Sequence, residues 1–163
     1  MARQLAKRAR GLVSVMAMAG VTAYGAAAVV TVADVLGRRI GLPIEGVVDL
    51  VQLFVVTGAW LAMPYAFMSA AHVSVDFLLA LMPDSLAVSL RLMAAALTLS
   101  LLALMLWQGF LTFQTRTMFG DKSQQLGIPV ALYWYPLLVG LAASMLGVLL
   151  ELHQALKGTP DHE

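Results

Sequence analysis

Two ionisable side chains lie close together at the middle of the sequence, between Met63 and Pro83. His72 and Asp76 are four residues apart, which would put both on one face of a helix. They also alternate with apolar residues, as in an extended chain, so the local conformation stays open. An imidazole and a carboxylate could ligate a metal ion. Because no third ligand accompanies them, a hydrogen-bonded pair that holds this segment is the better interpretation.

Residues for other kinds of chemistry are scarce. The sequence has no cysteine, which excludes a disulfide framework, a thiolate nucleophile and a cysteine metal site. Of its 163 residues, 61% are apolar and 12% are charged, whereas charged residues reach about 25% in soluble domains. The net charge of +1 gives no reason to propose nucleic-acid binding. This composition is typical of a membrane protein.

Four long apolar segments make up most of the chain, and each approaches or exceeds the roughly 20 residues that cross a bilayer. The first is longer than the roughly 7–15 apolar residues of a signal-peptide core, so we expect an uncleaved transmembrane helix. The sequence therefore predicts an all-α membrane protein with a single four-helix membrane domain. The expected spans are residues 11–33, 47–71, 92–115 and 128–150, preceded by a basic N-terminus at 1–10 and followed by a polar tail at 151–163.

An even number of spans puts both termini on one side of the membrane, and the distribution of basic residues indicates which side. Six basic residues lie in the termini or at the edge of the central loop: Arg3, Lys7, Arg8, Arg10, Arg91 and Lys157. Four lie in the first and third loops: Arg38, Arg39, Arg116 and Lys122. We predict that both termini and the central loop are cytoplasmic.

Ionisable side chains at the centre of a bilayer are costly and usually functional, but here they lie in loops or near the ends of spans. Asp49 falls in the first turn of the second span, where the helix dipole favours a carboxylate; the alternative is a contact with a cation on a partner subunit. Trp60 lies near the centre of the same span and could pack on a protein helix rather than on lipid. Hydroxyls within spans are expected to bond their own helix backbone. The notable polar groups there are Thr22, Thr31, Thr57, Thr98, Ser100, Gln108 and Ser144.

Several short motifs, in this order and across nearly the whole chain, resemble the DctQ family, the small membrane subunit of tripartite ATP-independent periplasmic (TRAP) transporters. The motifs are Arg38-Arg39, Gly41-Leu-Pro-Ile-Glu-Gly46, His72-Val-Ser-Val-Asp76, Leu81-Met-Pro83 and Ser123-Gln-Gln-Leu-Gly-Ile-Pro129, followed by Tyr133 and Pro136. One departure is Asp49, where the family commonly has a glutamate with longer reach.

The resemblance implies a mechanism divided between three proteins in a bacterial inner membrane and periplasm. A periplasmic binding protein captures a small organic acid, such as a carboxylate or sialic acid, and a large membrane subunit imports it using a sodium gradient. The small subunit would be a scaffold without a cofactor. Its candidate contacts with the large subunit are Asp49, Trp60, His72 and Asp76. Its candidate contacts with the binding protein are Arg38, Arg39, Arg116 and Lys122, for which ordinary solvated loop charge is the alternative.

Two other classes fit a four-helix membrane protein less well. A stand-alone small exporter that couples to protons needs an ionisable group in the membrane, and residues 11–33 have none. A haem-binding anchor of a respiratory enzyme needs axial ligands within the spans. The histidines His72, His153 and His162 all lie outside the expected spans.

Overall fold

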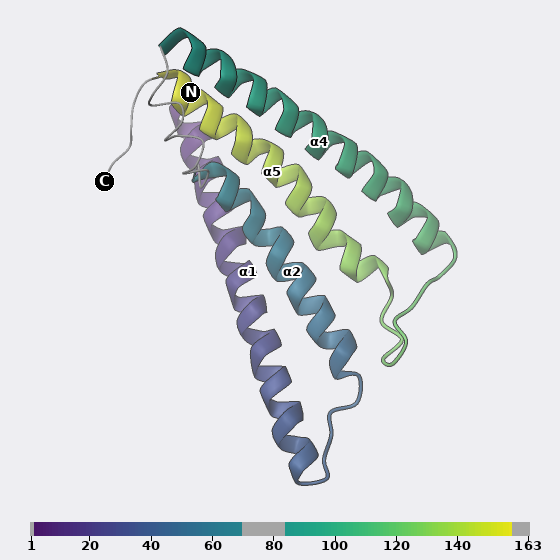
Figure 1. The fold of residues 1–163 in the computed structure, drawn as a ribbon. Helices are drawn as coiled ribbons and strands as arrows, with labels where there is room; N and C mark the ends of the chain where they lie inside the picture. Colours follow the sequence, from purple (N-terminus) through teal and green to yellow (C-terminus); the bar gives the residue numbers. More distant parts are fainter. Residues whose placement is uncertain (1, 70–83, 158–163) are drawn as a thin grey trace.

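The computed structural model describes residues 2–69 and 84–157, and these residues form four long helices joined by short loops (Figure 1). The helices are α1 (Ala2–Arg39), α2 (Val47–Met68), α4 (Asp84–Met118) and α5 (Ala131–Lys157). Each contains an apolar stretch long enough to cross a bilayer. The predicted all-α fold with four such helices is confirmed. The predicted pair of His72 and Asp76 lies outside the described residues.

The helices lie side by side in an open row instead of closing into a bundle. The order across the row is α1, α2, α5, α4, so that α2 and α5 are the inner helices. Among the described residues, α4 packs substantially on α5 alone, and α1 packs mainly on α2. Of the apolar stretch of α5, 33% is buried, compared with 11% for α1 and for α4. Both outer helices therefore present wide apolar surfaces to their surroundings.

Small residues set the spacing between neighbouring helices. A Cβ atom added at Gly20 of α1 would lie 2.8 Å from the carbonyl oxygen of Gly58 in α2. On the other side of α2, Gly140 and Gly147 of α5 pack directly on the backbone of Trp60 and Pro64. Lipid tails are as apolar as side chains, so close backbone approach of this kind is a main source of helix association in a membrane.

The two ends of the row differ. The start of α1 and the end of α5 lie at one end, while the α1–α2 and α4–α5 loops lie together at the other (Figure 1). The helices α2 and α5 are close at the first end and spread apart toward the loops. We call the second end the loop end; it comprises residues 34–49 and 116–133.

Candidate functional site

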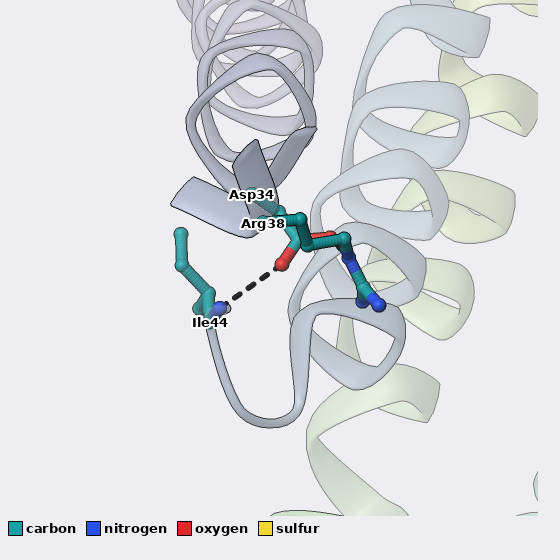
Figure 2. Close-up of polar contacts among 3 residues, drawn as sticks. All are labelled: Asp34, Arg38 and Ile44. Atoms are coloured by element: carbon teal, nitrogen blue, oxygen red, sulfur yellow. Dashed lines mark hydrogen bonds and ion pairs between the residues drawn. The ribbon is translucent and has the colours of Figure 1, made fainter. Parts of the chain in front are cut away.

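Two buried carboxylates organise the loop end, and Asp34 is the first. Its Oδ1 atom accepts a hydrogen bond of 3.0 Å from the backbone amide of Ile44, in the loop that leads to α2 (Figure 2). Its Oδ2 atom accepts a bond of 2.7 Å from Nε of Arg38, one helical turn later. Asp34 is 6% exposed although it lies in the last turns of α1. The carboxylate thus fixes the turn between α1 and α2.

Asp49 makes the corresponding link between α2 and the α4–α5 loop. Its Oδ2 atom accepts hydrogen bonds from the backbone amides of Gln125, at 3.0 Å, and Leu126, at 2.7 Å. The hydroxyl of Tyr133 in α5 donates to the backbone carbonyl of Asp49 at 3.0 Å. Asp49 is 5% exposed. Its carboxylate is therefore an internal clamp on a loop that lies more than 70 residues away in sequence.

The α4–α5 loop has the regular geometry that this clamp needs. The backbone amide of Ser123 donates to the carbonyl of Ile128 at 2.8 Å, and the amide of Ile128 donates to the hydroxyl of Ser123 at 2.9 Å. Gly127 has a φ of 67°, a conformation that glycine adopts without strain. Leu126 then packs against Gly46 of the other loop, where any Cβ atom would clash with the leucine side chain. The two loops consequently form one connected unit.

A cavity of about 540 Å³ lies between α2 and α5 next to this unit. Asp49 and Trp60, which the sequence suggested separately as interface residues, both contribute to its wall. Trp60 is half-buried and also packs against the buried cluster that contains Leu102 and Leu141. The residues around the cavity are Val48, Asp49, Gln52, Val56, Trp60, Ser123, Gln124, Gln125, Val130, Tyr133, Trp134 and Leu137.

The four basic residues suggested for docking all lie at the loop end, but they differ in availability. Arg38 is paired with Asp34, and Arg116 is paired with Asp121 at 2.9 Å. Arg39 and Lys122 are exposed, and neither pairs with a carboxylate within the described ranges. These two cations are free to meet a partner.

Four of the hydroxyl groups named from the sequence, those of Thr22, Thr31, Ser100 and Ser144, bond their own helix backbone, as predicted. Thr22 donates to the carbonyl of Met18 at 2.9 Å, and Thr31 donates to that of Ala27 at 2.8 Å. Ser100 and Ser144 do the same with the carbonyls four residues before them. Across residues 2–69 and 84–157, no three histidine or acidic side chains gather as a metal site would require. Charged side chains in these ranges lie near the helix ends.

Sequence reasoning did not find the clamps at Asp34 and Asp49. The position of Asp49 in a first helical turn is already explained by the helix dipole. The sequence therefore gives no sign of its bonds to the backbone amides 76 and 77 positions later. The four-residue spacing of Asp34 and Arg38 is typical of an ion pair on a helix. The bond from Ile44 depends on the path of the turn, which that spacing does not reveal.

These features define a multi-pass helical membrane protein whose polar groups serve its own architecture. A comparison with protein families matches residues 27–158 to the model described as "Tripartite ATP-independent periplasmic transporters, DctQ component". The chain therefore belongs to the DctQ family and is the small membrane component of a TRAP transporter, not an enzyme. Searches of curated proteins and of solved structures gave no match. The family match supports the transporter subunit over the exporter and the respiratory anchor.

Proposed function

We propose that this chain is the non-catalytic scaffold subunit of a sodium-driven TRAP transporter that imports a small organic acid. It lies in the bacterial inner membrane, crosses it four times, and has both termini in the cytoplasm. It packs against a large membrane subunit that carries the substrate path. The observation that carries this proposal is the open row of four apolar helices, which in the described residues has charges only near its ends.

The charge distribution is the first reason. A protein that moves an anion together with sodium needs polar groups or interrupted helices at the membrane midplane. Here the uncharged stretches 11–33, 50–68, 92–115 and 131–150 are helical throughout. We infer that substrate and sodium pass through another subunit and that this chain contributes structure to the complex.

The cavity beside α2 is our proposed contact region for the large subunit. Trp60 offers a half-buried aromatic surface there, and Asp49 holds the loop that forms one wall. His72 and Asp76 stay candidates for the same interface, although they lie outside the described residues. We expect Trp60→Ala to lower recovery of the large subunit when the tagged chain is purified in mild detergent. Asp49→Lys should lower it indirectly, because it releases the α4–α5 loop that forms one wall of the cavity.

The loop end is our proposed docking surface for the periplasmic binding protein. The loops are tied together by the Asp34 and Asp49 clamps, so they present a fixed surface. Arg39 and Lys122 are exposed on it and would meet acidic groups of the binding protein. Arg38 and Arg116 would contribute mainly by shaping the loops, because each already has a carboxylate partner.

A reconstitution experiment tests the proposal. The large subunit would be placed in liposomes with and without this chain, and uptake of a labelled organic acid would be measured with binding protein and an inward sodium gradient. We expect uptake only when all three proteins are present. Transport by this chain alone, or full uptake in its absence, would rule out the scaffold role.

A further inference from the structure

The outer helix α4 has two apolar seams on opposite faces, and α5 covers one of them. The inner seam repeats at intervals of four and three residues, the spacing of interlocking helices. Ala95 and Leu102 of this seam are buried, Gly109 approaches Leu137 of α5, and the ring of Phe113 lies 5.4 Å from that of Tyr135. The complete inner seam is Ala95, Leu99, Leu102, Leu106, Gly109 and Phe113.

The outer seam repeats with the same spacing but has no partner within the described chain. Its leucines are strongly exposed, from 41% at Leu111 to 63% at Leu97. The other two positions of the seam, Gln108 and Thr115, carry polar groups and are also exposed. The complete outer seam is Leu97, Leu101, Leu104, Gln108, Leu111 and Thr115.

Gln108 distinguishes this seam from a surface that simply faces lipid. Its side chain carries two donors and an acceptor, and makes no hydrogen bond in the described part of the protein. By contrast, Thr112 and Thr115 on the same helix donate to the carbonyls of Gln108 and Leu111. Gln108 lies eight residues before Arg116, or about 12 Å along the helix axis, inside the uncharged stretch 92–115. An amide that enters the hydrocarbon needs a protein partner, since lipid tails offer neither donors nor acceptors.

We propose that the outer seam of α4 binds a transmembrane helix of the large subunit, with the amide of Gln108 hydrogen-bonded to a polar side chain or backbone carbonyl on that helix. This inference rests on the proposed function and adds a contact separate from the cavity beside α2. The leucines on either side of Gln108 exclude lipid, and the amide fixes the register of the two helices. Small and polar residues commonly have this role between membrane helices.

α1 provides the contrast on the other edge of the row. Its exposed face includes Val21 and Val29, at 65% and 69% exposure, and its hydroxyls at Thr22 and Thr31 are bonded to their own helix. This outer face is therefore suited to contact with lipid, and positions on it serve as controls for positions on α4.

Site-specific photocross-linking in native membranes tests the contact. A photoreactive amino acid would replace Leu104 or Leu111 on the outer seam, and Val21 or Val29 on α1 as controls. We expect adducts with the large subunit from α4 and none from α1.

In parallel, Gln108→Leu should weaken the complex in detergent about three- to tenfold, as expected for one hydrogen bond between membrane helices. Gln114→Leu, at an exposed amide on another face of α4 and two residues from Arg116, should leave affinity unchanged.

The outcomes separate this inference from the proposed function. If the wild-type chain recovers the large subunit but both α4 positions cross-link only to lipid, the scaffold role stands and the α4 contact is overturned. Adducts with a second copy of this chain would overturn it equally, since Gln108 would then face its own symmetry mate. An unchanged affinity for Gln108→Leu would overturn the role of the amide. Failure of the wild-type chain to recover any large subunit would contradict both.

Discussion

At the scale of single residues, two buried acidic side chains near helix ends hold the loops. Asp49 accepts two backbone hydrogen bonds from the α4–α5 loop, and Asp34 accepts one from the α1–α2 loop. Leaving a buried backbone amide without its acceptor lowers the free energy of unfolding, whereas an exposed ion pair contributes little to stability. The clamps should therefore matter more for stability than the surface pairs beside them.

This difference predicts the effect of removing each kind of carboxylate. Asp49→Ala leaves the amides of Gln125 and Leu126 without their acceptor and should lower the free energy of unfolding by about 1–3 kcal/mol. Asp121→Ala removes only the exposed pair with Arg116 and should cost less than about 1 kcal/mol. Denaturant unfolding in detergent micelles, together with protease cleavage of the loop, would measure both. Equal losses for the two variants would contradict the clamp.

The free cations at the loop end give a second prediction at this scale. Reversing both charges, with Arg39→Glu and Lys122→Glu, should weaken capture of the binding protein roughly two- to thirtyfold, since each of the two exposed ion pairs is worth up to about 1 kcal/mol. The loss should shrink at high salt, because salt screens exposed charges. Lys7→Glu, an exposed residue at the opposite end of the row, is the control and should have no effect. Surface plasmon resonance with the complex in nanodiscs would report the affinities.

At the scale of helices, glycines in contact with a neighbouring backbone determine how closely the elements pack. A methyl group at Gly140 would overlap the carbonyl oxygen of Trp60, and one at Gly147 would lie 2.6 Å from that of Pro64. Backbone atoms cannot move aside as a flexible side chain can. The α2–α5 contact, which joins the two halves of the chain, thus requires residues without a side chain at these positions.

A matched pair of substitutions tests this requirement. Gly140→Ala should destabilise the protein by about 1–3 kcal/mol, the usual cost of overpacking. Gly25→Ala, on α1 with nothing within 4 Å of the added methyl, should be neutral or stabilise the helix by up to about 1 kcal/mol. Unfolding by titration with a denaturing detergent, followed by tryptophan fluorescence, would compare them. A neutral Gly140→Ala would mean that α2 and α5 pack less closely than the structure indicates.

The helices themselves were predictable from the sequence, because uncharged runs of this length have few alternatives in a membrane. The residues at which the helices begin and end were harder to predict. The first helix continues beyond residue 33 to Arg39, since Asp34 and Arg38 pair on the helix and the turn closes only after them. The neighbour of each helix was not predictable, because α1 and α4 carry apolar residues on every face.

At the scale of the whole molecule, the row of helices has a polar loop end and an opposite end with the start of α1 and the end of α5. Asp49 and Trp60 were singled out from the sequence for separate reasons, and the structure brings them to one cavity. Their meeting depends on the fold of α5 and its loop against α2. Composition and spacing do not carry that information, since it arises from contacts between residues far apart in the chain.

The orientation of this row in the membrane is a further prediction. The absence of native cysteine allows single cysteines to be introduced at Glu45, Lys122 and Lys7, which are exposed at the two ends. A membrane-impermeant maleimide added to spheroplasts should label Glu45→Cys and Lys122→Cys at once, and Lys7→Cys only after the membrane is broken. Immediate labelling of Lys7→Cys with protection of the other two would reverse the proposed topology.

The central claim is that this chain works as a structural partner of a large membrane subunit. The most direct test is to purify the tagged chain from native membranes in mild detergent and to identify what accompanies it by mass spectrometry. We predict a large multi-pass membrane protein in stoichiometric amount. Recovery of the chain alone, as a homodimer or with bound haem would contradict the scaffold role.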